Sequence, residues 1–310
     1  MKILIELPTW LGDTVMTTPA IENLVSHVTD AEITLLGSFV STQALKSHSK
    51  VIQTYVLDKN YLNFYRSLKA LGDFDMFLSF RGSFRSKITK LFISSGRKYQ
   101  FDKSRYIEGH QVEKYNSFIN DSLCIKSVAA KLVLNTVNKN KNKNKKKKLL
   151  GINPGASYGI AKRWYPNKFA DVAYDLSSEY DIIIFGGPSE KNIAKDIEMF
   201  LIDKGVVNYK NLAAQTSIEE LISQISNLDL FITGDSGPMH LAAAFQIPTV
   251  SIFGPTNDDE TSQWMNEHSM AVKKNLECQP CMKRVCPLKH HNCMKLVEAS
   301  DVLSAVKMLN

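Results

Sequence analysis

The chain has 310 residues, and its 44% hydrophobic and 22% charged content excludes a disordered or fibrous protein. Its length exceeds what one hydrophobic core usually serves, so two domains are expected. The net charge of +7 equals the seven lysines between residues 138 and 148, so the remainder is neutral and no basic fold is indicated.

The start of the chain carries no targeting pattern. Its short apolar run is broken by Glu6, Pro8 and Asp13, and no small-residue cleavage site follows. No apolar run elsewhere approaches the roughly 18 residues of a membrane span. We therefore expect a cytoplasmic protein.

Short apolar runs alternate with longer amphipathic ones along the first half. The expected strands are residues 2–7, 32–37, 51–57 and 74–80. The expected helices are residues 14–27, 61–71 and 84–94. This alternation predicts a parallel sheet with helices on both faces.

Residues 138–148, NKNKNKNKKKK, interrupt that alternation. They contain nothing to bury and repel one another, which predicts a solvated linker between domains of residues 1–137 and 149–310. A nucleic-acid-binding arm is the alternative. It is less favoured because no aromatic residues for stacking bases are interleaved with the lysines.

The alternation resumes in the second half. The expected strands are residues 149–153, 181–185, 229–233 and 249–253. The expected helices are residues 169–178, 193–202, 218–226 and 238–245, with a last helix capped at Ser300. Two such halves joined by a linker predict a cleft between them, with ligands at the carboxyl ends of the strands.

The first polar turn, PTWLGDT, follows the opening strand. In one interpretation Asp13 caps a helix that begins at Thr14. In the other, Asp13 is a carboxylate base at the edge of the cleft. Position alone favours the cap.

Two further turns could face a nucleotide. NPGAS at residues 153–157 leads to Lys162 and Arg163, which either bind a phosphate or belong to an ordinary solvated loop. Ser157 adds a hydroxyl there. FGGPSE, at residues 185–190, supports a backbone-lined pocket only weakly, because Gly-Gly-Pro is common in turns.

The turn TGDSGPMH, at residues 233–240, carries the strongest signal. Ser236 is expected to cap a helix that Pro238 enters near its first position, so free amides would form an anion site for a diphosphate. His240 is either a core residue, which we favour, or a ligand of donor hydroxyls. Neither the dinucleotide-binding glycine fingerprint nor a P-loop is present, which disfavours hydride transfer and kinase chemistry.

Four cysteines lie within sixteen residues, at positions Cys278, Cys281, Cys286 and Cys293. With His290 and His291 they offer enough soft ligands for a structural zinc site, although the spacing is not that of two Cys-x₂-Cys knuckles. Reduced thiols in a loop are the alternative. A zinc module with a lysine arm would also describe a nucleic-acid-binding protein.

Taken together, these segments resemble glycosyltransferase family 9, the heptosyltransferases of lipopolysaccharide core assembly. LPTWLGDTVMTTPAIENL is similar to the family's opening strand, turn and helix, and GDSGPMHLAAAFQIPTVSIFGPT to its most recognisable block. NPGASYGIAKRW and CQPCMKRVCPLKHHNC resemble the type II enzymes rather than type I. The match spans nearly the whole chain in order, while types I and III stay as alternatives.

The resemblance implies an α/β fold of the GT-B class, with two Rossmann-like domains whose parallel sheets face an interdomain cleft. The acceptor would bind the first domain and ADP-heptose the second, and the last helix could pack back on the first domain. The resemblance makes Asp13 the general base, which reverses the preference for a cap. Lys162 becomes a catalytic residue that binds the donor phosphates. The implied donor-binding residues are Ser157, Lys162, Arg163, Gly186, Glu219, Asp235, Ser236, Gly237, Pro238, Met239 and His240.

The implied reaction is an inverting, metal-independent transfer of heptose to the first heptose of the inner core, so no cofactor is expected. The acceptor is an anionic glycolipid, which implies peripheral contact with the inner face of the inner membrane and no nucleic-acid partner. Thr9, Trp10, Gly12, Arg81 and Arg85 are the implied acceptor-binding residues. A group of basic residues in the first half is expected to join them: Lys87, Lys90, Arg97, Lys98, Lys103 and Arg105. A non-catalytic nucleotide-sugar binder is a further alternative.

Overall fold

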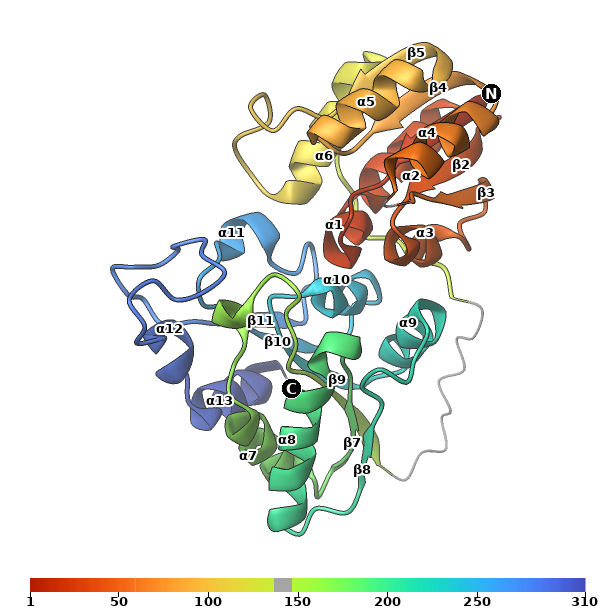
Figure 1. The fold of residues 1–310 in the computed structure, drawn as a ribbon. Coiled ribbons are helices and arrows are strands. Elements are labelled where there is room, and N and C mark those ends of the chain that lie inside the picture. Colours follow the sequence, from red (N-terminus) through yellow and green to blue (C-terminus); the bar gives the residue numbers. More distant parts are fainter. Residues whose placement is uncertain (59, 137–146, 310) are drawn as a thin grey trace. The chain divides into compact units, whose positions relative to one another are not determined.

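A computed structural model describes residues 1–58, 60–136 and 147–309 (Figure 1). The chain divides into two compact units, Met1–Val137 and Asn138–Asn310. Residues 138–146 of the expected linker lie outside the described residues. Lys148, expected at the end of the linker, instead begins the first strand of the second unit.

The first unit is built on a five-stranded sheet in the order β3-β2-β1-β4-β5, with every pairing parallel. Its strands are β1 (Lys2–Glu6), β2 (Glu32–Gly37), β3 (Val51–Val56), β4 (Asp73–Ser79) and β5 (Ser94–Gln100). Its helices are α1 (Leu11–Met16), α2 (Thr18–His27), α3 (Phe39–Leu45), α4 (Tyr61–Ala70), α5 (Phe84–Phe92) and α6 (Gln111–Leu123).

Alternating side chains of this sheet pack on its two faces. Leu4, Leu36 and Phe77 pack with Phe64 of α4 in one apolar cluster. Residues one position away point to the opposite face. Helices therefore cover both faces, as the alternation of elements predicted.

The helix expected at residues 14–27 is two helices. Thr17 ends α1 and directly precedes α2. The first of them begins at Leu11, with Trp10 at the N-cap, so Asp13 lies inside the first turn. The expectation that Asp13 caps a helix starting at Thr14 is therefore wrong.

The second unit is built on a six-stranded parallel sheet in the order β11-β10-β9-β6-β7-β8 (Figure 1). Its strands are β6 (Lys148–Asn153), β7 (Tyr180–Ile184), β8 (Tyr209–Asn211), β9 (Leu230–Gly234), β10 (Thr249–Ile252) and β11 (Ser269–Val272). Its α-helices are α7 (Pro166–Leu176), α8 (Lys191–Asp203), α9 (Ile218–Ser226), α10 (Gly237–Ala244), α11 (Asp258–Thr261), α12 (Asn292–Lys295) and α13 (Ala299–Leu309). Two short 3₁₀ turns, Ile160–Lys162 and Pro188–Glu190, complete the unit.

The last helix packs in the core of the second unit. Val302 and Val306 of α13 are buried with Ile152 of β6, Val250 of β10 and Phe169 of α7. The helix begins at Ala299, one residue before the N-cap expected at position 300.

Both sheets reverse their strand order between two central neighbours. The reversal lies between β1 and β4 in the first unit and between β6 and β9 in the second. Loops that leave the carboxyl ends of such neighbours in opposite directions open a crevice, which is the usual ligand position in these folds. Among the described helices, none is long and apolar enough to cross a membrane.

Candidate functional site

The carboxyl ends of β6 and β9 bring a buried ion pair together. Asp235 directly follows β9 and is 6% exposed. Its Oδ2 accepts hydrogen bonds from Lys162 Nζ at 2.5 Å and from Thr256 Oγ1 at 2.6 Å. Thr256, which the sequence did not single out, follows β10 in the neighbouring Gly-Pro-Thr turn. Three loops therefore converge on one carboxylate at the point where the strand order reverses.

Lys162 ends the 3₁₀ turn that follows β6, and its side chain is 11% exposed. Its ammonium lies 4.7 Å from the centre of the Tyr158 ring, which adds a cation–π contact. The guanidinium of Arg284 lies 5.2 Å from the same ring. Two cations thus flank one aromatic side chain beside Asp235.

The N-terminus of α10 lies next to this ion pair in the chain. Ser236 occupies the N-cap position as expected, but its hydroxyl does not cap the helix. Instead, Ser236 Oγ accepts from Asn153 Nδ2 and lies 3.1 Å from Thr233 Oγ1. Because the Ser236 hydroxyl does not cap this first turn, the helix N-terminus keeps its attraction for an anion.

The glycine-rich turns pack against Glu190. This residue is buried, and its Oε2 accepts a hydrogen bond from the Gly187 amide at 2.6 Å. A Cβ on Gly155 would lie 2.0 Å from the Glu190 carboxyl carbon, so any larger residue there would have to displace this carboxylate. Glu190 joins the turns after β6 and β7; it ends the 3₁₀ turn Pro188–Glu190 and directly precedes α8.

The other expected donor residues differ in exposure. Arg163 follows Lys162, and its buried Nε has no hydrogen-bond partner among the described residues. Ser157 is exposed, and so is Glu219 in the first turn of α9. Gly186, Gly237 and Pro238 are partly exposed in their turns, whereas Met239 and His240 are buried.

In the first unit, Asp13 lies after β1, in the first turn of α1. Asp13 is partly buried, and its charge acts on Tyr115 of α6. Burial of the Tyr115 hydroxyl raises its pKa well above the usual value, and the negative charge of Asp13 raises it further. Gly12 is buried, whereas Thr9 and Trp10 are exposed, Trp10 by 51%. The turn thus presents a carboxylate beside an exposed indole.

Glu6, at the end of β1, is a fully buried carboxylate that no sequence pattern had indicated as a site residue. Its oxygens accept from Ser79 Oγ at 2.6 Å and from Ser86 Oγ at 2.9 Å, and Arg81 lies 3.6 Å away. Burial raises the pKa of Glu6, and the hydroxyls, Arg81 and Arg85 offset part of that rise. Glu6 therefore lies beside Arg81, one of the two arginines expected to bind an acceptor, and feels the charge of the other, Arg85.

The larger basic group does not form one surface. Arg97 and Lys98 lie midway along β5, opposite Met76 and Phe77 of β4, rather than at its carboxyl end. Arg105 is paired with Asp121 at 2.7 Å. Lys87 and Lys90 lie along α5, and Lys103 lies in an exposed turn.

The four clustered cysteines are free thiols that lie near one another. The pKa of the Cys293 thiol is raised to about 11, mainly because it is buried. The neighbouring thiols of Cys286, Cys278 and Cys281 add to that rise. Within the described parts of the chain, no three His, Cys, Asp or Glu side chains are arranged to hold a metal ion. The zinc alternative therefore gains no support from the geometry.

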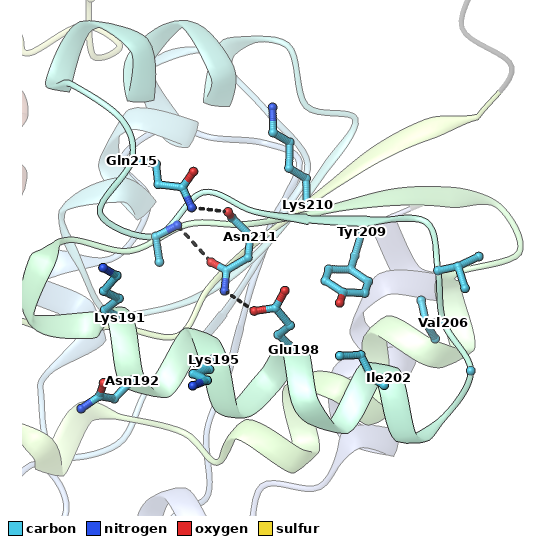
Figure 2. Close-up of a pocket in the computed structure, with 13 residues that line it drawn as sticks. Lys191, Asn192, Lys195, Glu198, Ile202, Val206, Tyr209, Lys210, Asn211 and Gln215 are labelled. Atoms are coloured by element: carbon cyan, nitrogen blue, oxygen red, sulfur yellow. Dashed lines mark hydrogen bonds between the residues drawn. The ribbon is translucent and has the colours of Figure 1, made fainter.

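A separate hollow of about 890 Å³ lies between α8 and β8 (Figure 2). Asn211 organises it by donating to Glu198 Oε2 at 3.0 Å and accepting from the amides of Ala213 and Gln215. None of the expected donor-binding residues lines this hollow. It lies at the sheet edge, away from the reversal of strand order.

Comparisons with known proteins agree with this architecture. The model of glycosyltransferase family 9 (heptosyltransferase) matches residues 62–292. Lipooligosaccharide heptosyltransferase 2 of Campylobacter jejuni serotype O:2 is 45% identical, with 100% of this chain and 98% of the relative covered.

Solved structures share the fold. E. coli ADP-heptose lipopolysaccharide heptosyltransferase II superposes with a TM-score of 0.82 at 21% identity, covering 100% of this chain and 98% of the other. E. coli heptosyltransferase WaaC with ADP gives a TM-score of 0.79 at 15% identity, with both chains fully covered. The expected GT-B class, with two parallel-sheet α/β domains, is confirmed. The chain is a member of glycosyltransferase family 9, the heptosyltransferases.

Proposed function

We propose that this protein transfers heptose from ADP-heptose to the first heptose of the lipopolysaccharide inner core. The observation that carries the proposal is the convergence of Lys162 and Thr256 on Asp235 at the carboxyl ends of the central strands. This arrangement places a cation, a carboxylate and a helix N-terminus at the carboxyl ends of neighbouring strands. Full-length similarity to a type 2 enzyme supports the choice of acceptor.

In the proposed reaction, an acceptor hydroxyl oxygen attacks the anomeric carbon while the bond to the diphosphate oxygen breaks. The configuration inverts, ADP leaves, and the Asp13 carboxylate takes the hydroxyl proton. General-base catalysis of this kind typically contributes ~10²–10⁴-fold to the rate.

Negative charge grows on the departing diphosphate. Lys162, Arg163 and the first amides of α10 are proposed to stabilise it, because fixed donors at a partly buried site lower the energy of developing charge. Asp235 would hold the donor sugar and Glu219 the ribose. These roles account for the charged residues of the turns without requiring a metal ion.

The acceptor side is proposed to involve Thr9, Trp10 and Gly12 of the first turn, with Arg81 and Arg85 binding acidic groups of the glycolipid. Such an acceptor lies at a membrane surface. We therefore propose a cytoplasmic enzyme that contacts the inner face of the inner membrane.

The test is transfer from ADP-heptose to defined core acceptors that carry either no heptose or one, read by mass spectrometry. A mass increase of one heptose on the acceptor that already carries one is the expected result. Transfer only to the heptose-free acceptor would make the protein a type I enzyme. ADP binding without any transfer would instead indicate a non-catalytic binder.

A further inference from the structure

The cysteine-rich segment, residues 277–293, holds both backbone groups of the residue before Lys162. The amide of Ala161 donates to the carbonyl oxygen of Arg284 at 3.1 Å. The carbonyl oxygen of Ala161 accepts from Nε2 of His291 at 2.9 Å. Because a carbonyl only accepts, Nε2 of His291 carries the proton in this contact. The backbone position of Lys162 is thus set by a segment more than a hundred residues away.

Further contacts join the same segment to the turn that carries Lys162. The hydroxyl of Tyr158 donates to the carbonyl oxygen of Met282 at 2.7 Å. Nδ1 of His291 lies 3.2 Å from the hydroxyl of Tyr165. A Cβ on Gly159 would lie 2.4 Å from the Arg284 carbonyl oxygen, so the two backbones meet where only glycine fits.

The segment also holds the other side of the ion pair. The Met282 amide donates to Pro255 O at 2.8 Å, and Gln279 Nε2 donates to Gly254 O at 2.7 Å. Pro255 directly precedes Thr256, whose hydroxyl donates to Asp235. The segment therefore touches the residue before each of the two donors to the Asp235 carboxylate.

We propose that the cysteine-rich segment positions the donor-phosphate turn and that His291 is its positioning residue. The proposal rests on the proposed function, in which Lys162 binds the donor diphosphate. A turn held in place before the ligand arrives loses less conformational freedom on binding, and its affinity is correspondingly higher. His291 acts through Ala161 and does not need to touch the donor.

The chain supplies a matched control for His291. Its neighbour His290 is exposed, and its Nδ1 accepts a hydrogen bond from the Asn292 amide at 3.0 Å. Asparagine is the conservative replacement, because His291 has φ of 54° and asparagine tolerates the left-handed region. Its side-chain amide takes the place of Nδ1, so it can keep the contact with Tyr165 while the bond from Nε2 to Ala161 is lost.

The experiment compares H291A, H291N and H290A in the full chain. ADP affinity is measured by calorimetry, heptose transfer by steady-state kinetics, and folding by thermal unfolding. H291A should weaken ADP binding about 5- to 50-fold, since it removes two side-chain hydrogen bonds of typical strength. The ADP affinity of H290A should stay within twofold of wild type. H291N should recover part of the ADP affinity that H291A loses, and the acceptor KM should stay unchanged in all three variants.

A double-mutant cycle separates positioning from general destabilisation. In a K162A background, H291A should cost little further ADP affinity, because its effect passes through Lys162. Equal losses in both backgrounds would overturn the proposal, and so would an unchanged ADP affinity in folded H291A. If H291A does not fold, the Y158F variant tests the positioning role of the segment by the same criteria, because it removes the hydrogen bond to Met282.

Failure of the proposed function has a different signature. Wild-type protein that binds ADP but transfers no heptose would contradict the proposed function, while the affinities of the variants would still decide the role of His291. Wild-type protein that does not bind ADP would overturn both proposals.

Discussion

The ammonium of Lys162 lies 2.5 Å from Oδ2 of Asp235, and both side chains are nearly closed to solvent. A diphosphate that approaches Lys162 therefore meets a cation that is already paired. Donor binding has to share or replace that contact. Removing one member of such a pair also leaves the other charge buried and unpaired, which is strongly destabilising.

The K162A variant should weaken ADP binding about 10- to 100-fold, the loss expected for a charge-assisted hydrogen bond. It should also unfold at a lower temperature, because Asp235 keeps a buried charge. The K162A/D235N double variant should regain most of that stability and none of the ADP affinity. Calorimetry and thermal unfolding measure both effects. Unchanged donor KM and kcat in K162A would contradict the phosphate role.

The D13N variant should bind ADP like wild type while its turnover falls at least ~10²-fold, because the amide cannot accept the proton. Folding should change little, since Asp13 is not the N-cap residue of α1 and asparagine keeps its size and a hydrogen-bonding side chain. A charge near a helix N-terminus typically contributes 0.3–1 kcal/mol. Single-turnover kinetics and ADP titration measure the two quantities. Turnover near the wild-type rate would remove Asp13 from the mechanism.

The E6Q variant should alter the pH dependence of folding stability. Burial raises the pKa of Glu6 above its usual 4.5, so the folded state holds this proton at pH values where the unfolded state has released it. Its contribution to stability is therefore largest below pH 4.5 and is lost as pH rises through the native pKa.

Glutamine cannot titrate, so the stability difference between E6Q and wild type should change across that window. Denaturant unfolding at a series of pH values measures it. Parallel stability curves for the two proteins would show that Glu6 does not titrate as inferred.

The R81Q variant should raise the acceptor KM about 3- to 10-fold at low salt, because one charge facing an anionic ligand is lost. Arg81 follows the carboxyl end of β4, whereas Lys98 lies midway along β5. K98Q is therefore the matched control and should leave the acceptor KM unchanged. Equal effects of the two variants would point to net charge rather than to a site.

The G159A variant should weaken ADP binding and lower the unfolding temperature. Its new Cβ would overlap the Arg284 carbonyl oxygen, so the backbones of the two segments would have to separate. Calorimetry with ADP measures the first effect. Wild-type affinity in this variant would show that the close approach does not affect the donor turn.

Local sequence patterns predicted most of the central elements. The helix expected at residues 218–226 matches α9, because Ser217 caps it with Glu220 and its apolar residues repeat at helical spacing. The strand expected at residues 32–37 matches β2. By contrast, β5, β8 and β11 were not expected. All three are edge strands. The sequence of β5 is mostly polar, and β8 and β11 have only three and four residues, too few to show a strand pattern.

The candidate site, too, could be predicted from the sequence only in part. The residue types and their order singled out Asp13, Lys162 and Asp235 as candidates, since a carboxylate in a turn after a strand, a cation in a loop and a helix start are local signals. The contact between Lys162 and Asp235 joins residues 73 positions apart, and the same separation divides Glu6 from Ser79. No periodicity in the sequence predicts that such distant residues form a contact. The sequence by itself thus determined the family, the alternating elements and the chemistry of the turns. Only the tertiary structure decided which side chains meet, because packing brings together residues whose separation along the chain leaves no local pattern.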